Sequence, residues 1–381
     1  MLFPIADVVV NPFLLLLLGL LVGTLGGFFG VGGGFLVTGG LLVFGVPATF
    51  AVGTGLTLIM GSSIINTLKH RRLGNVDFKL GFLMVVGTVP AVFGAEEVIK
   101  LMESADITGP AIRYIYVAFL AVLGSFLIYD YRRSHSREQS ASGDVSTVKL
   151  AHRVQAINIG PSRLWFPGLG WTPTYISLPV SGIERISVFI PIFIGAIIGF
   201  FAGLLGAGGG FILMPTLVFI LGVPTMVAIG TDLFQIIITG SVGTFVKSLS
   251  NSVDPVMVVI MLASASFGSQ IGAAATKVVD PTRIRVLFGV TILSGSLAVA
   301  LKQVSESVSG TDFLSTVASG VLLGVAGAIC LLIAGLLVKA TLHQTDADSP
   351  DGQQKDHQYE EGAGAKRDAA GGDIETRRGD L

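Results

Sequence analysis

Two matched runs of glycine are the residues of this chain whose type and spacing could do chemistry. The runs are Gly30, Gly32, Gly33 and Gly34 before Phe35, and Gly206, Gly208, Gly209 and Gly210 before Phe211. Glycine adopts positive φ readily and leaves backbone N–H groups uncovered by side chains. If a short helix starts directly after each run, at Phe35 and at Phe211, its unpaired N–H groups and its positive end converge on one point. The sequence therefore predicts an anion site at each run.

Tight helix crossing is the alternative explanation for these glycines, because small residues let helix backbones approach closely. One run alone would leave the two explanations equally good, whereas two matched runs favour binding. Neither run is a nucleotide motif, since no Gly-Lys-Ser/Thr ending follows and no strand precedes it.

The chain carries the whole neighbourhood of the glycine run twice. Gly30 and Gly206 lie 176 positions apart (206 minus 30), and the segments that follow match at 177 because one residue is inserted. The matching segments are Gly45-Val46-Pro47 with Gly222-Val223-Pro224, Gly53-Thr54 with Gly230-Thr231, and Val76-Asp77 with Val253-Asp254. A repeat of this length indicates a duplicated membrane unit rather than a solenoid.

The composition indicates a membrane protein. The 381 residues are 51% hydrophobic and only 13% charged, with a mean hydropathy of +0.78, which excludes a soluble globule with an ordinary polar surface. We therefore expect the lipid bilayer to surround the helices. The net charge of −1 and the lack of a basic patch outside short loops indicate no nucleic-acid partner.

Apolar segments divide the chain into four parts. We expect a first transmembrane repeat in residues 1–130, a cytoplasmic or interfacial loop in 131–185, a second transmembrane repeat in 186–338 and a disordered charged tail in 339–381. Because roughly 20 apolar residues cross a bilayer, the runs right after the glycines are too short to cross alone. The predicted fold is an all-α polytopic membrane protein of two pseudo-symmetric repeats, with broken or short helices after the glycine runs and about 8–11 membrane segments.

The loop has an aromatic and proline-rich part, residues 157–180, with Trp165 and Trp171. Its prolines exclude a helix. Either this part lies at the headgroup level, where aromatic rings settle, or it is an ordered loop folded onto the helix ends.

The charges of the loops favour an inverted arrangement of the two repeats. Basic residues gather at 69–72, 131–137 and 277–285, and loops rich in Lys and Arg stay in the cytoplasm. If the short segments only dip into the membrane, each half crosses four times and the halves are parallel. If they cross, each half crosses five times and the halves are inverted, and only then are all three basic loops cytoplasmic. The inverted arrangement also places the C-terminal tail in the cytoplasm.

Few polar residues lie inside the apolar segments. Thr54 and Thr231 match each other, and Gln235 lies one turn beyond Thr231, so we expect these three to complete the hydrogen bonds to a bound anion. Asp232 is the only carboxylate well inside a predicted span and is the candidate for proton coupling. Its alternative role is to reach the interface or to cap a broken helix.

The doubled Gly-x-Gly-Gly-Gly-Phe resembles the TauE/SafE family of membrane permeases. Each copy is followed by Gly-Val-Pro and then by Ala-Val-Gly-Thr (51–54) or Ala-Ile-Gly-Thr (228–231), and the resemblance covers residues 12–130 and 186–338. Members of that family are associated with export of sulfur-containing anions such as sulfite and sulfoacetate. The resemblance implies anion transport, with the two glycine runs as the matching positions.

These observations together predict a secondary transporter that moves a small sulfur-containing anion across the cytoplasmic membrane by alternating access. A gradient, for instance of protons, must drive it because no ATP-binding motif is present. A transporter of another solute, such as a carboxylate or a cation, and a passive anion channel stay open, and a homo-oligomer is compatible with the sequence.

An intramembrane enzyme is disfavoured, and we expect no cofactor and no metal. The five histidines lie in loops, at helix ends or in the tail, without metal-ligand spacing. No nucleophile is paired with a base. The single cysteine, Cys330, excludes an intrachain disulfide.

Overall fold

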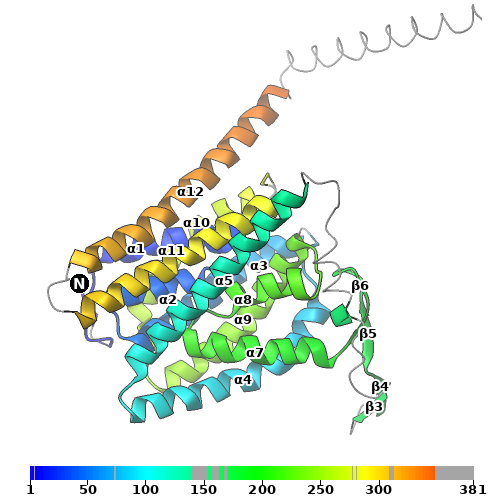
Figure 1. Cartoon of the computed structure of the whole chain (residues 1–381), viewed down its shortest axis with the longest axis horizontal. Helices are drawn as coiled ribbons and strands as arrows, with labels where there is room; N and C mark the ends of the chain where they lie inside the picture. The colour runs from blue at the N-terminus through cyan, green and yellow to red at the C-terminus, as the bar shows by residue number, and fades with distance from the viewer. Residues whose placement is uncertain are drawn as a thin grey trace, which may run out of the picture. The chain divides into compact units, whose positions relative to one another are not determined.

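The computed structural model describes residues 1–3, 5–72, 74–138, 153–155, 163–166, 170–276, 278–279, 281–308 and 313–347. In these residues the chain is almost entirely helical (Figure 1). The chain divides into two compact units, Met1–Ile333 and Ala334–Leu381. The helix bundle described below belongs to the first unit, and the second unit contributes only the last part of helix α12.

The first half of the chain holds five helices with a break after the first. They are α1 (Pro12–Phe29), α2 (Gly34–Val43), α3 (Ala48–Arg72), α4 (Phe78–Ser104) and α5 (Thr108–Glu138). Their starts follow from local sequence, because Asn11 accepts a hydrogen bond from the N–H of Phe13, and Asp77 accepts one from the N–H of Leu80.

The second half follows a similar order, with α8 and η1 together in the place of α2, and it has one further helix at its end. The helices are α7 (Phe189–Leu205), α8 (Gly210–Pro215), the π-helix η1 (Thr216–Ile220), α9 (Thr225–Leu249), α10 (Pro255–Ala275), α11 (Pro281–Ser307) and α12 (Phe313–Ala347). Asp254 caps α10 as Asp77 caps α4, by accepting hydrogen bonds from the N–H groups of Val256 and Met257.

Three two-stranded antiparallel sheets complete the described elements. They are β1 (Leu2–Phe3) with β2 (Val8–Val9), β3 (Arg163–Phe166) with β4 (Gly170–Pro173), and β5 (Tyr175–Leu178) with β6 (Ile183–Ser187). The first hairpin leads into α1 and the third leads into α7, so each half of the chain begins with a hairpin before its first helix.

The predicted all-α polytopic class is confirmed. Eight helices are long and apolar enough to cross a membrane, and three apolar helices are shorter, Gly34–Val43, Phe189–Leu205 and Gly210–Ile220. These shorter segments include both helices that follow the glycine runs, as the sequence predicted. The predicted count of membrane segments is confirmed by these helices.

Two helices run further than the sequence predicted. α5 continues to Glu138, into the part assigned to a loop, and α12 continues to Ala347, into the part assigned to the tail. Charged residues such as Arg and Lys are good helix formers, so leaving the apolar region does not end a helix. The predicted disorder of the tail beyond residue 347 lies outside the described residues, as do residues 139–152 of the loop.

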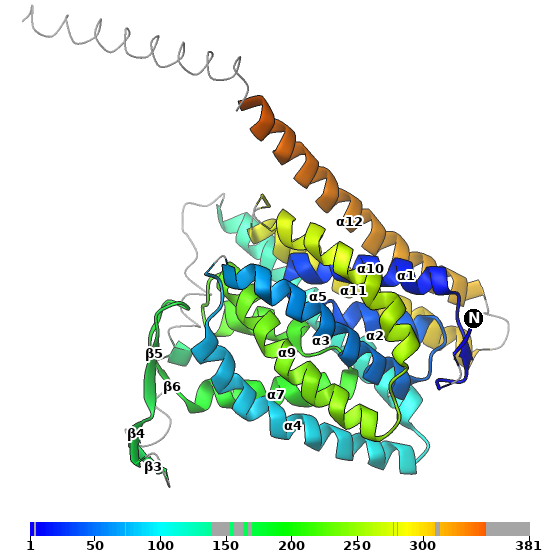
Figure 2. The same cartoon turned by 180° about the vertical axis from the view of Figure 1, so that it is seen from behind.

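Two pairs of helices join the halves and run parallel at close range. A Cβ atom on Gly23 of α1 would lie 2.6 Å from the Cα atom of Ala265 of α10, and one on Gly19 would lie 2.8 Å from the Cα atom of Met261. α4 and α7 are related in the same way, with Gly195 beside Met84. These glycines let the backbones touch, and Figure 2 shows α1 beside α10.

Two other pairs join matching helices and run antiparallel. Gly243 of α9 lies against Leu56 of α3, and Gly240 lies against Met60. α5 and α11 also oppose each other in direction, and they lie side by side in Figure 1. Antiparallel packing of matching helices is the register that inverted halves would give. The orientation of the halves across a membrane stays a prediction.

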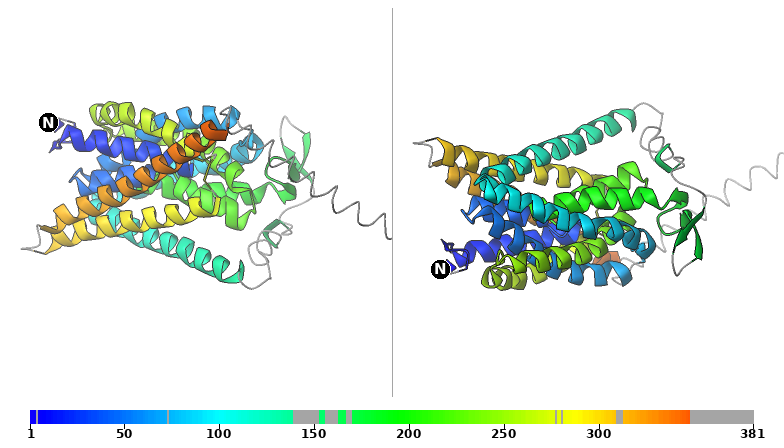
Figure 3. Two further views of the ribbon diagram at one scale, coloured as in Figure 1. Left: turned by 90° about the horizontal axis from the view of Figure 1, so that it is seen from above. Right: turned by 90° about the horizontal axis from the view of Figure 1, so that it is seen from below.

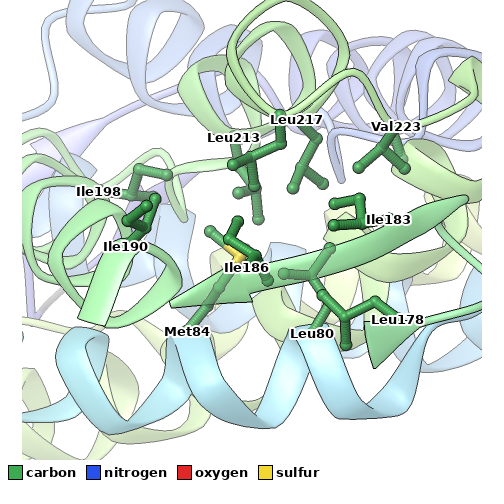
Figure 4. Close-up of a cluster of buried hydrophobic side chains, with 12 residues drawn as sticks. Leu80, Met84, Leu178, Ile183, Ile186, Ile190, Ile198, Leu213, Leu217 and Val223 are labelled. Atoms are coloured by element: carbon green, nitrogen blue, oxygen red, sulfur yellow. The ribbon is translucent and has the colours of Figure 1, made fainter. Parts of the chain in front are cut away.

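The hairpin β5–β6 is folded onto the ends of the helices. Leu178, Ile183 and Ile186 are fully buried in one apolar cluster with side chains of α4, α7 and α8 (Figure 4). The hydroxyl group of Ser181 also donates a hydrogen bond of 2.7 Å to the carboxylate of Asp77. Figure 3 shows the hairpin at one end of the bundle. The residues from 175 onward thus form an ordered hairpin on the helix ends, and their level relative to a membrane stays a prediction.

Candidate functional site

Each glycine run forms a sharp break between two helices. α1 ends at Gly30 with φ of 75°, and α7 ends at Gly206 with φ of 69°. The glycines before the next helices, Gly33 and Gly209, have φ of 72° and 80°. Only glycine adopts such angles without strain. The short helices start at Gly34 and at Gly210, one residue earlier than predicted.

The two runs touch each other in the interior. A Cβ atom on Gly34 would lie 2.2 Å from the carbonyl oxygen of Ala207, and one on Gly210 would lie 2.8 Å from the carbonyl oxygen of Val31. The rings of Phe35 and Phe211 follow, with centroids 6.4 Å apart. All residues of both runs are buried. The structure thus brings together two runs that lie 176 positions apart in the sequence (206 minus 30).

Several backbone N–H groups of the runs lack a protein acceptor. Within the described part of the chain, those of Gly32, Gly33, Gly34 and Phe35 donate to no protein group, and the same holds for Gly208, Gly209, Gly210 and Phe211. Buried N–H groups without a partner are rare in proteins. Leaving such a group unpaired costs about 1–3 kcal/mol. The two runs therefore present a concentrated set of donors to something other than the chain.

The predicted threonines are tied to the helix that starts in the opposite half. The N–H of Asp254 donates to the side-chain oxygen of Thr54 at 3.1 Å, and the N–H of Asp77 donates to that of Thr231 at 2.9 Å. Both threonines are fully buried. Each oxygen therefore accepts one hydrogen bond from the protein, and its hydroxyl hydrogen can still donate to a solute.

Gln235 also has a partner that the sequence did not reveal. Its amide nitrogen donates to the hydroxyl of Thr88 on α4 at 2.8 Å. That hydroxyl lies 3.0 Å from the carbonyl oxygen of Gly195 on α7. The Gln235 side-chain oxygen is buried without a partner. The amide donor is therefore used between α4, α7 and α9, not at the glycine runs.

Asp232 is fully buried in α9, and neither oxygen of its carboxylate has a hydrogen-bond partner. It thus neither reaches the surface nor caps a helix, which removes both structural roles that the sequence left open. An ionised carboxylate is costly in such surroundings unless a proton or a cation joins it.

Ser63 and Asn66 on α3 were not among the predicted site residues, although both lie in an apolar span. Their spacing of three places them on one helix face. The side-chain oxygen of Ser63 lies 2.9 Å from where a Cβ atom on Gly32 would be. Both side chains are buried, and their polar atoms lack partners. Their position on one face of an apolar helix was the sequence feature that could have identified them as site residues.

The described residues beside the two helix breaks offer mainly hydrogen-bond donors to a solute. Among them, no group of three His, Cys, Asp or Glu side chains could hold a metal ion. The buried Lys247 is not available to a solute, because its nitrogen lies 2.6 Å from an oxygen of Glu96. What gathers at the break between the helices is a set of unpaired neutral donors.

Eight long apolar helices and two matched helix breaks in contact define this chain as a polytopic membrane protein. Residues 15–299 match the family described as "Sulfite exporter TauE/SafE". Because this match covers most of the 381 residues, the chain belongs to the TauE/SafE family, and the predicted resemblance is confirmed.

Curated relatives carry the same class of name. The chain is 24% identical over 288 residues to the probable membrane transporter protein YunE of Bacillus subtilis, which covers 74% of this chain and 94% of YunE. It is 23% identical over 291 residues to the probable membrane transporter protein MJ0441 of Methanocaldococcus jannaschii, over 72% and 90% of the two chains. No solved structure matches the chain.

Proposed function

We propose that this protein is a secondary transporter that moves small sulfur-containing anions, such as sulfite or sulfoacetate, across the cytoplasmic membrane. The observation that carries this proposal is the contact between the two glycine runs, whose buried N–H groups have no protein acceptor. Backbone N–H groups at the start of a helix bind anions. The name of the matched family, a sulfite exporter, supports sulfur oxyanions as the solute class.

Alternating access fits the way in which the halves are joined. Matching helices of the two halves pack antiparallel, α3 against α9 and α5 against α11. In transporters built from inverted repeats, one half rocks against the other around a site at the midplane, where discontinuous helices meet. The two breaks of this chain are the discontinuous elements, and the solute would lie between them.

Proton coupling through Asp232 is part of the proposal. The carboxylate is fully buried and lacks a hydrogen-bond partner, so its ionised form is expensive where it lies. A proton that binds Asp232 removes this cost. The same proton offsets part of the charge of an anion bound nearby.

A protein that binds another small solute and a passive anion channel are the rivals. Heat unfolding in detergent, with sulfite, sulfoacetate, acetate or sodium chloride added at equal ionic strength, separates the candidate solutes. A ligand that binds only the folded protein raises the unfolding midpoint, because at about 100 times its Kd it adds about 2.7 kcal/mol. We expect protection by the sulfur anions. Protection by acetate alone, or by none of the anions, contradicts the proposed solute class.

A further inference from the structure

We infer that Ser63 and Asn66 bind the solute beside the first glycine run. The site is asymmetric in this respect, because the second glycine run has no matching pair of side chains. This inference rests on the proposed function. It adds two side chains to the backbone donors, and among the sulfur anions it favours a small oxyanion that can both accept and donate a hydrogen bond.

Both side chains lie along the break between α1 and α2. The oxygen of Ser63 lies 2.9 Å from the position of a Cβ atom on Gly32, and the side-chain oxygen of Asn66 lies 3.1 Å from that of a Cβ atom on Gly27. Gly27 is in the last turn of α1, and Gly32 is in the break itself. The two side chains therefore follow the chain from the end of α1 to the unpaired N–H groups at the start of α2.

Neither side chain is satisfied by the protein. Ser63 is 0% exposed and Asn66 is 1% exposed. The hydroxyl of Ser63 and both polar atoms of the Asn66 amide have no hydrogen-bond partner. Burying an unpaired amide or hydroxyl costs about 1–3 kcal/mol, so a partner from outside the chain would stabilise the protein where these groups are buried.

The matching positions of the second half offer no such pair. The residues at the matching positions, 177 further on (63 to 240 and 66 to 243), are Gly240 and Gly243. The space beside them is filled, because Cβ atoms there would lie 3.0 Å from the Cβ of Met60 and 2.9 Å from a methyl group of Leu56. This pair of unpaired neutral side chains therefore comes from the first half alone.

The chemistry of the pair indicates the kind of solute. A serine hydroxyl and an asparagine amide donate hydrogen bonds without charge, and the amide oxygen also accepts one. A hydrogen sulfite ion carries acceptor oxygens and one O–H group, which suits the amide. A sulfonate has only acceptor oxygens, so it would leave the Asn66 oxygen unpaired. We therefore expect the native protein to bind hydrogen sulfite in preference to methanesulfonate.

The test is uptake of labelled sulfite into proteoliposomes by the native protein, Ser63→Ala and Asn66→Leu, with methanesulfonate as competitor. Ser241→Ala is the matched control, since Ser241 is exposed on α9 beside Gly240 and donates within its own helix. We expect Asn66→Leu to raise the half-saturating sulfite concentration about ten- to hundredfold, because a hydrogen bond to a charged group is lost. The concentration of methanesulfonate needed to compete should rise by a smaller factor. The half-saturating sulfite concentration of the control variant should stay within about twofold of the native value.

Folding of the variants is checked by heat unfolding without solute. Asn66→Leu removes an unpaired polar group, so its unfolding midpoint should equal or exceed that of the native protein. Native sulfite uptake that Ser63→Ala and Asn66→Leu leave unchanged would overturn this assignment alone. A native protein that moves no sulfur anion would overturn the proposed function and this assignment with it.

Discussion

The backbone N–H of Asp77 donates a hydrogen bond of 2.9 Å to the side-chain oxygen of Thr231, and this contact joins the two halves of the chain. The same contact with the two halves interchanged is present as well: the backbone N–H of Asp254 donates to the side-chain oxygen of Thr54 at 3.1 Å. Each threonine thus holds the start of a helix in the other half. Two residues that the sequence predicted to bind the solute thus also hold the two halves together by hydrogen bonds.

Replacing either threonine by valine should destabilise the protein to a similar extent. Thr54→Val and Thr231→Val keep the side-chain volume but leave a buried backbone N–H without an acceptor, which costs about 1–3 kcal/mol. The measurement is the unfolding midpoint in detergent. Thr57→Val is the control, because its hydroxyl donates only to the carbonyl of Gly53 within α3. Equal midpoints for all three variants would contradict the fastening role.

The ion pair between Lys247 and Glu96 should affect the stability of the protein strongly because it is buried. Their side chains are 3% and 8% exposed, so removing one partner leaves an uncompensated charge at a cost of about 3–5 kcal/mol. We expect Glu96→Gln and Lys247→Met each to lower stability by that order, and the double variant to lose less than the sum. A double-mutant cycle measures the difference. Additive losses would mean that the two charges do not interact.

An exposed ion pair on the same helix is the control for this cycle. Lys100 and Glu97 lie in the last turns of α4 and are 56% and 69% exposed. Exposed pairs contribute little to stability. Glu97→Gln should therefore leave the unfolding midpoint unchanged.

Glycines at the close helix crossings should not tolerate a methyl group. A Cβ atom on Gly272 of α10 would lie 1.9 Å from the carbonyl oxygen of Thr24 of α1, whereas one on Gly324 of α12 meets nothing within 4 Å. We expect Gly272→Ala to lower the yield of folded protein or to cost about 1–3 kcal/mol or more. Gly324→Ala should have no such effect. Equal behaviour of the two variants would show that the crossing of α1 and α10 is looser than described.

Asp232→Asn tests the coupling role separately from solute binding. The amide keeps the shape of the carboxylate but does not take up a proton at the pH of the assay, so we expect solute-dependent heat protection to persist. Uptake into proteoliposomes should no longer respond to an imposed proton gradient. An Asp232→Asn protein whose uptake still follows the proton gradient would remove Asp232 from the coupling mechanism.

The contact between the glycine runs could be predicted because the repeat itself carries the information. Inverted halves would bring two matched breaks together near the middle of the bundle, and Gly34 does lie against Ala207. The starts of α4 and α10 were equally readable, since Asp77 and Asp254 are ordinary N-cap residues. These features depend on local sequence or on the repeat.

The partners of the polar side chains could not be predicted in this way. Gln235 bonds to Thr88, 147 residues away, and this pairing depends on how α4, α7 and α9 cross. Similarly, Ser63 faces Gly32 because α3 packs against the break. A sequence pattern shows that such residues share a helix face. The residues that this face contacts depend on how helices distant in the sequence pack together.

The hairpin β5–β6 was not predicted as a hairpin; an ordered loop on the helix ends was one of two alternatives for this part of the chain. The sequence features that indicate it are two short apolar runs, one of which has apolar residues at alternate positions. They flank a turn that contains Pro179 and Gly182. The surrounding prolines and tryptophans made the whole stretch look like one irregular loop. The burial of Leu178 and Ile186 against α4 and α7 is what orders it.

The most direct test of the proposed function is uptake of labelled sulfite, sulfoacetate and acetate by the native protein in proteoliposomes, with and without a proton gradient. We predict saturable uptake of the sulfur anions, little uptake of acetate, and faster uptake when a proton gradient is imposed. Protein-free vesicles supply the background. Uptake of neither sulfur anion above that background, by protein that unfolds cooperatively on heating, would contradict the central claim that the meeting glycine runs form the solute site of a sulfur-anion transporter.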